Sequence, residues 1–218
     1  DSSYFFGGSV SDATVEYSVI AQDYFFRYQG EGYYDFIDYN YDSGPSAFYA
    51  GSDNGTIATG MAVTDTQGEF IIEIPADLGD ASQSQTYIVE ATVRDETGQS
   101  VSGRGEVIVH QGEFYIGARA ENYVSTADEA STINIIAVDW DSQPLANAEI
   151  EVEVVDRRWS SVQERDETGR TVWTYEVEEI PVTEGQIQTD ASGQAQFTFT
   201  PETGGSFKVY ITSQDDRG

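Results

Sequence analysis

Apolar and polar residues alternate along most of the chain, which is the pattern of half-buried β-strands. Residues 15–19 (VEYSV), 150–154 (IEVEV) and 197–199 (FTF) alternate strictly. Residues 87–93 (YIVEATV) and 207–211 (FKVYI) are continuous β-branched or aromatic runs of strand length. No stretch combines a helical apolar stripe with capping residues at both ends. The pattern therefore predicts an all-β chain.

Turns that begin with aspartate and end with glycine separate the expected strands. They occupy residues 65–68, 95–98, 166–169 and 190–193. An aspartate opens such a turn because its carboxylate accepts hydrogen bonds from the backbone amides ahead of it, and glycine tolerates the positive φ near the exit. Short strands at this spacing predict antiparallel β-sandwiches of the immunoglobulin or fibronectin type.

An internal repeat sets the expected number of domains. Residues 10–19 (VSDATVEYSV) match residues 145–154 (LANAEIEVEV), and residues 64–68 (TDTQG) match residues 189–193 (TDASG). In both halves an alternating strand, a proline and an aromatic strand follow the second phrase. One sandwich unit is therefore expected to occur twice.

The two expected domains, residues 1–110 and 111–218, differ in what precedes the matched phrase. The second domain has residues 114–138 available for its opening strands, whereas the first has only residues 1–9 in that place. We therefore expect the first domain to lack its first strand or strands, which would leave an unpaired edge and uncovered apolar side chains.

The domains are also expected to carry different insertions. Residues 23–55 form an aromatic and acidic insertion in the first domain, and its tyrosines are expected to fold back over the sandwich edge; stacking on a sugar or a partner protein is the alternative. Residues 156–182 read as a long hairpin in the second domain. Packing in the core or on the hairpin is the interpretation that we favour for Trp140, Trp159 and Trp173.

The charge and the cysteine count exclude several classes of function. The formal net charge is −29, and a surface this acidic repels nucleic acid and anionic membranes. With no cysteine, the chain holds no disulfide, zinc–cysteine site, iron–sulfur cluster or catalytic thiol. No apolar run is long enough for a membrane span, and the first residues do not show the pattern of a signal peptide. It begins at Asp1 rather than Met, so we expect a processed product or a fragment.

The sequence offers little for catalysis. His110 is the single histidine, and at a strand end near the domain join it is better interpreted as a partly buried linker residue than as a general base. Pairs of carboxylates carry no information, because 39 acidic residues bring some pairs together in any fold. We therefore assign no catalytic and no cofactor-binding residue.

One stretch has the spacing of a calcium loop, with oxygen ligands at Asp38, Asn40 and Asp42. It departs from the EF-hand pattern because Ser43 replaces the usual glycine and Tyr49 replaces the closing glutamate. A solvated acidic loop is the interpretation that we favour, so no metal is expected.

A set of phrases in the chain resembles a known family. In the second half they are residues 114–117 (FYIG), 137–145 (AVDWDSQPL), 157–165 (RRWSSVQER) and 201–207 (PETGGSF), and in the first half residues 4–10 (YFFGGSV). This series is similar to tandem macroglobulin modules of bacterial alpha-2-macroglobulins, over nearly the whole chain. The phrase at residues 157–165 is the most specific part of the resemblance.

The resemblance implies two fibronectin-like β-sandwich modules of a large secreted, periplasmic or cell-surface protein that traps proteases. That family forms its covalent trap from the cysteine and glutamine of a Cys-x-Glu-Gln motif, which this cysteine-free chain lacks. The modules would then act as frame, non-catalytic in isolation. Their partners would be neighbouring macroglobulin domains of the same chain, and target proteases only through the full-length protein.

Two other functions remain open from the sequence. Spacer or display domains of a bacterial surface adhesin would use the same sandwiches, and so would an accessory or catalytic domain of a carbohydrate-active enzyme. The flanking sequence discriminates among them: a thioester motif or bait segment favours the inhibitor, tandem near-identical repeats favour the adhesin, and a catalytic domain favours the enzyme.

Overall fold

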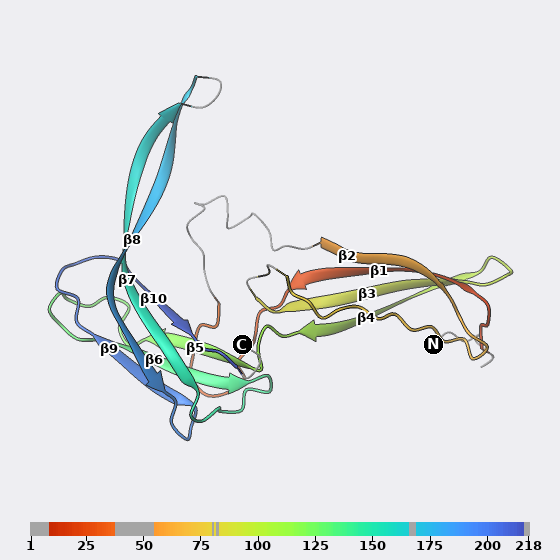
Figure 1. Ribbon diagram of the computed structural model, residues 1–218, viewed down its shortest axis with the longest axis horizontal. Coiled ribbons are helices and arrows are strands. Elements are labelled where there is room, and N and C mark those ends of the chain that lie inside the picture. The colour runs from red at the N-terminus through yellow and green to blue at the C-terminus, as the bar shows by residue number, and fades with distance from the viewer. Residues whose placement is uncertain (1–8, 38–54, 80, 82, 166–168, 216–218) are drawn as a thin grey trace. The chain divides into compact units, whose positions relative to one another are not determined.

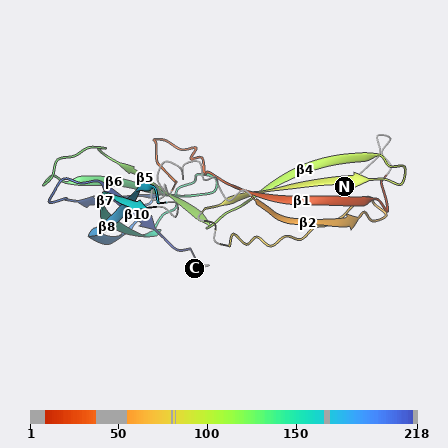
Figure 2. The same cartoon turned by 90° about the horizontal axis from the view of Figure 1, so that it is seen from above.

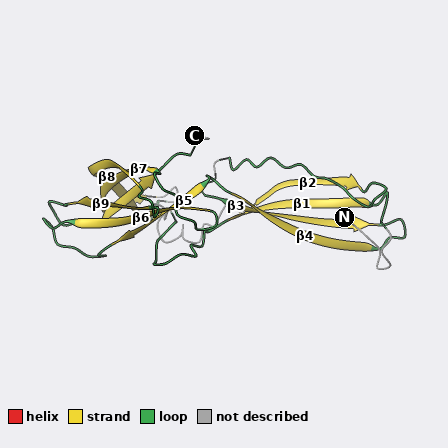
Figure 3. Ribbon diagram, turned by 90° about the horizontal axis from the view of Figure 1, so that it is seen from below, coloured by secondary structure: helices red, strands yellow, loops and turns green. Residues whose placement is uncertain are grey.

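The computed structural model describes residues 9–37, 55–79, 81, 83–165 and 169–215, and these residues contain ten strands and no helix (Figure 3). Every strand pairs antiparallel to its neighbours. The all-β, antiparallel fold class predicted from the alternation is thus confirmed. The chain divides into two compact units, the first made of Asp1–Tyr24 and Gly51–Gln111 and the second of Phe25–Ala50 and Gly112–Gly218.

The first unit contains a single four-stranded sheet, in which the strands lie side by side in the order β2-β1-β3-β4 (Figure 2). The strands are β1 (Thr14–Asp23), β2 (Gly55–Val63), β3 (Gln85–Arg94) and β4 (Ser100–Val109). A register shift between Val19 and Ile20 interrupts the ladder of β1 with β2, whereas the other two ladders run without a shift.

One face of this sheet is covered by the chain that follows β2. Phe70 packs on the cluster that contains the buried Val15, and Ile74 packs on the cluster that contains the buried Val19. No strand pairing holds this segment to the sheet in the described residues, so it covers the face through its side chains. Over β1 this segment takes the place of the second sheet of a sandwich.

The same face is bare over the edge strand β4. The register sets Val101 opposite Val93 and Val107 opposite Tyr87, so both valines share the face that is buried elsewhere. Val101 is nevertheless 61% exposed and Val107 57% exposed. Within the described residues the first unit therefore has one sheet. The second layer that the sequence predicts for it is not among these strands.

The second unit is a two-sheet sandwich (Figure 1). One sheet has the order β10-β7-β8 and the other β5-β6-β9. The strands are β5 (Phe114–Ala120), β6 (Ser131–Asp139), β7 (Glu149–Arg165), β8 (Thr171–Gln188), β9 (Gln194–Phe199) and β10 (Phe207–Thr212).

The core of the second unit lies between these two sheets. Alternate residues of β6, among them Ile133 and Ile135, meet alternate residues of β7, among them Ile150, Val152 and Val154. Each side chain of this kind contributes about 1.5–3 kcal/mol when it is fully buried. The alternation recognised in the sequence is thus the alternation that fills this core.

The turns that open with aspartate form as predicted wherever they are described. Asp65 Oδ1 accepts hydrogen bonds from the amides of Gln67 (2.8 Å) and Glu69 (2.9 Å), and Gly68 has a φ of 80°. Asp190 accepts from Ser192 (2.8 Å) and Gln194 (3.0 Å), with Gly193 at a φ of 70°. The hydrogen bonds are local, which is why the sequence alone identifies such turns.

Candidate functional site

His110 follows β4 and packs edge-on against Tyr24, with ring centroids 5.9 Å apart and an interplanar angle of 82°. Burial lowers the pKa of the imidazole from its ordinary value, so the ring is neutral at neutral pH. An aromatic contact of this kind fits the interpretation as a partly buried residue near the end of a strand.

The three residues with calcium-loop spacing, Asp38, Asn40 and Asp42, lie outside the described residues. In the part of the chain that the structure describes, no group of three or more histidine, aspartate or glutamate side chains is arranged to hold a metal ion.

The aromatic segment at residues 25–37 packs on β5, the edge strand of the second unit. Phe26 stacks on Tyr115 with centroids 4.2 Å apart and an interplanar angle of 16°. Asp35 and Ala118 exchange two backbone hydrogen bonds of 2.8 Å, so the segment adds a short bridge to the edge of β5. The aromatics at the start of the insertion therefore cover the edge of the second sandwich rather than that of the first.

A cluster of rings completes this edge. Tyr28 lies 6.0 Å from Tyr34 and 5.8 Å from Phe36 between ring centroids, and the guanidinium of Arg119 lies 5.4 Å from the centre of the Tyr34 ring. Burial is the first cause of the raised pKa of Tyr28. These rings therefore pack against one another and against Arg119, which agrees with the interpretation favoured from the sequence.

The base of the long hairpin is held by a polar cluster. Arg157 is only 5% exposed, and its Nε lies 3.1 Å from Glu179 Oε1 across the two strands. The hydroxyl of Tyr210 on β10 donates to the same carboxylate over 2.8 Å. Burial first, and then this hydrogen bond, raises the pKa of Tyr210. The cluster joins all three strands of the sheet near the beginning of β10.

The three tryptophans differ in how they are held in the structure. Trp140 donates from Nε1 to the carbonyl of Gly112 over 2.9 Å, so it is held by a backbone contact. Trp159 is 50% exposed and Trp173 61% exposed, so neither lies in the core, but Trp159 packs on the hairpin, where the guanidinium of Arg157 lies 5.3 Å from the centre of its ring. They lie on the hairpin where no layer covers it.

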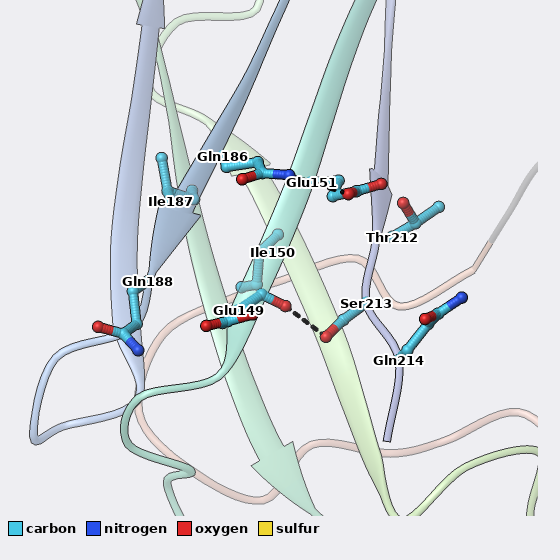
Figure 4. A pocket seen from close by; sticks show the side chains of 9 residues that line it. All are labelled: Glu149, Ile150, Glu151, Gln186, Ile187, Gln188, Thr212, Ser213 and Gln214. Atoms are coloured by element: carbon cyan, nitrogen blue, oxygen red, sulfur yellow. Dashed lines mark hydrogen bonds between the residues drawn. The ribbon is translucent and has the colours of Figure 1, made fainter. Parts of the chain in front are cut away.

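A polar groove lies at the end of the sheet where β7 begins and β8 ends (Figure 4). Glu151 Oε1 accepts a hydrogen bond from Gln186 over 3.1 Å, and the hydroxyl of Ser213 donates to the carbonyl of Glu149. Its lining side chains are carboxylates, amides and hydroxyls, together with Ile150 and Ile187. None of these lining groups is an imidazole or an amine, and its ionisable side chains are the carboxylates of Glu149 and Glu151.

The family model for bacterial macroglobulin domain 6 matches residues 116–218, which cover nearly all of the two-sheet sandwich. Residues 116–218 are a bacterial macroglobulin domain. The resemblance predicted from the phrases of the sequence is therefore confirmed for this half of the chain.

The wider comparisons agree with the assignment of this macroglobulin domain. An alpha-2-macroglobulin homolog of Yersinia pestis is 24% identical over 159 residues, which are 71% of this chain and 8% of that protein. The crystal structure of Salmonella alpha-2-macroglobulin reacted with methylamine superposes with a TM-score of 0.62 at 12% identity, over 96% of this chain and 14% of that one.

The native conformation of Escherichia coli alpha-2-macroglobulin, solved by cryo-electron microscopy, gives a TM-score of 0.59 at 12% identity over 98% of this chain and 15% of that one. At this identity the superpositions show the fold alone. They extend the likeness to the first unit, which the family model does not match. The chain spans only a small part of each of these relatives.

Proposed function

We propose that the chain is a pair of structural modules of a secreted, protease-trapping protein like the alpha-2-macroglobulins, and that it is non-catalytic in isolation. The match of residues 116–218 to a macroglobulin domain carries this proposal. We call the longer protein that contains the modules the parent protein. Its neighbouring macroglobulin domains are the direct partners of this chain, and target proteases meet the chain only through the parent.

The construction of the second unit supports a frame role. Its two sheets are joined by a core in which Ile135, Ile150 and Val154 are each 1% exposed or less. A core packed to this degree has low compressibility and transmits force from one end to the other instead of deforming. A frame that keeps a trap open until a distant cut requires that property.

The near absence of lysine from so acidic a chain supports a location outside the cytoplasm. No helix in the described part of the chain is long and apolar enough to cross a membrane. The relative structures include Escherichia coli alpha-2-macroglobulin activated by porcine elastase, which supports a protease as the target of the parent.

We further propose that the first unit is also a macroglobulin-type sandwich, in which a further layer covers the apolar face over β4. The bare apolar face over β4, with Val101 and Val107 exposed, supports this. Covering both valines would stabilise the unit by about 1–3 kcal/mol for each side chain.

Protease trapping by the parent protein tests the proposed function. The parent is incubated with trypsin or elastase, and hydrolysis of casein and of a small chromogenic peptide is followed. An enclosed protease should lose activity on casein while it still cleaves the small peptide, because only the peptide diffuses into the trap. This 218-residue chain alone should change neither rate.

Two results would contradict the proposal. One is a parent protein that leaves casein hydrolysis by both proteases unchanged. The other is hydrolysis of either substrate by the 218-residue chain alone, lost on substitution of a single carboxylate.

A further inference from the structure

The outer half of the hairpin formed by β7 and β8 stands as an isolated two-stranded ribbon. The third strand, β10, pairs with β7 only from Glu151 to Asp156, whereas β7 and β8 go on pairing from Arg157 to Arg165. In Figure 1 this ribbon projects away from the sandwich of the second unit. A two-stranded ribbon alone is marginally stable in water, so an ordered one needs a further surface against one of its faces.

One face of this ribbon carries large apolar side chains. The register sets Trp159 opposite Val177 and Gln163 opposite Trp173, and residues two apart on a strand share a face. We call this set the tryptophan face: Trp159, Gln163, Trp173 and Val177. Both indoles are half exposed or more, at 50% and 61%. Tryptophan is the residue type that most often supplies the binding energy of protein interfaces.

The direction of the ribbon is fixed at its base. The ion pair of Arg157 with Glu179, at 3.1 Å, lies at the first step beyond β10, and the guanidinium of Arg157 lies 5.3 Å from the centre of the Trp159 ring. Tyr210 anchors Glu179 to β10. The inner tryptophan is therefore held in place before anything binds, which reduces the ordering entropy that docking costs.

The charge of the ribbon differs from that of the rest of the chain. The two strands of the ribbon and their turn, residues 157–179, contain four of the ten basic residues and six acidic ones, so the ribbon has a net charge of −2 within a chain of net charge −29. Arg165 and Arg170 lie at the outer end, on either side of the turn, and both are exposed. Apolar side chains in the middle with arginines beyond them fit a surface that is apolar at its centre and acidic at its rim.

We propose that the tryptophan face docks on another domain of the same parent protein, on a surface of that composition. The proposal rests on the proposed function, since it requires a parent with further domains. The chain spans 8% of the Yersinia pestis relative and 14–15% of two solved alpha-2-macroglobulins, so most of such a parent lies outside it. A second copy of this chain is disfavoured because two bodies of charge −29 repel each other.

A photo-cross-linking amino acid at position 173 of the full-length parent tests the proposal directly. After irradiation, mass spectrometry should find cross-links from position 173 to a different domain of the same chain. The matched control carries the cross-linker at Tyr123, which is fully exposed on the loop after β5. Cross-links between two parent chains, cross-links confined to residues 116–218, or no excess over the Tyr123 control would each overturn the proposal.

Substitution provides a second measurement that separates docking from folding. Trp159→Ser with Trp173→Ser should raise amide hydrogen exchange of the ribbon in the parent about tenfold or more, and should leave exchange of the ribbon in the 218-residue chain nearly unchanged. Met61→Ser, at a side chain 71% exposed in the first unit, is the control. Equal effects in parent and isolated chain would overturn docking. Loss of protease trapping with the cross-links retained would instead contradict the proposed function alone.

Discussion

Phe36 occupies the space that a side chain at position 117 would need: a Cβ built on Gly117 would stand 2.5 Å from the Phe36 ring. The glycine of β5 thereby admits a ring from residues 25–37, a segment far away in the sequence. The same segment forms the backbone bridge of Asp35 with Ala118, one residue further along β5. The Phe36 ring can therefore pack against β5 only because position 117 is a glycine and has no side chain.

Gly117→Ala should destabilise the second unit by about 1–3 kcal/mol, because the new methyl group displaces the Phe36 ring. Gly103→Ala on β4 is the matched control: it also adds a methyl group to a strand glycine, but nothing lies within 4 Å of its Cβ. Chemical unfolding of both variants gives the comparison. Equal stabilities would show that Phe36 is not seated against β5.

Glu179→Gln should cost about 1–3 kcal/mol of unfolding free energy, because it leaves the guanidinium of the buried Arg157 without its counter-charge. The control is Glu90→Gln, whose pair with Arg104 spans 3.9 Å between two exposed side chains. Such a surface pair contributes about 0–1 kcal/mol. Urea unfolding of the two variants should therefore separate them, and a smaller loss for Glu179→Gln would refute the assigned ion pair.

Stability should fall in acid through the turn aspartates. The backbone amides of Glu69 and Gln67 lower the pKa of Asp65, and those of Gln194 and Ser192, with the Ser192 hydroxyl, lower that of Asp190. The folded chain then binds fewer protons than the unfolded chain, so this contribution is complete above the ordinary pKa of 3.8 and is lost as pH falls through the lowered values.

Asp190→Asn provides the test of that acid dependence. The amide oxygen still accepts hydrogen bonds but no longer titrates, so the curve of unfolding free energy against pH should be shallower below pH 3.8. The surface substitution Glu129→Gln serves as a reference. A slope for Asp190→Asn as steep as that of the unchanged chain would contradict the assignment.

His110 should add a second, milder pH dependence to the first unit. Burial lowers the pKa of its imidazole below the ordinary 6.5, so the unfolded chain takes up this proton first as pH falls. Stability should therefore be complete above pH 6.5 and decline as pH falls towards the lowered value. His110→Phe keeps a ring against Tyr24 and should abolish this decline in thermal unfolding followed between pH 8 and pH 5, about one unit or more to either side of the ordinary value.

The sequence alone predicts the features that depend on residues close together along the chain. The alternation at residues 150–154 predicts which side chains of β7 enter the core, because a strand turns successive residues to opposite faces. The turn at Asp190 follows from hydrogen bonds within four residues. The macroglobulin resemblance came from phrases that combine both kinds of signal.

Features that depend on distant segments were not predictable in the same way. Trp159 reads like a packed strand residue, yet it is half exposed because β10 ends before reaching it, and no local pattern fixes the length of a partner strand. The place where residues 25–37 pack depends on Gly117, about eighty positions later in the sequence. Only the spatial arrangement relates the two.

The division of the chain into two units determines what a single proteolytic cut can separate. Because Phe25–Ala50 belong to the second unit, the backbone passes between the units at three places: after Tyr24, after Ala50 and after Gln111. A protease that cuts any single passage leaves the units covalently connected through the other two. The second unit, in turn, covers the edge of β5 with a segment that lies between β1 and β2 of the first unit, so its edge is complete only when that earlier part of the chain is present.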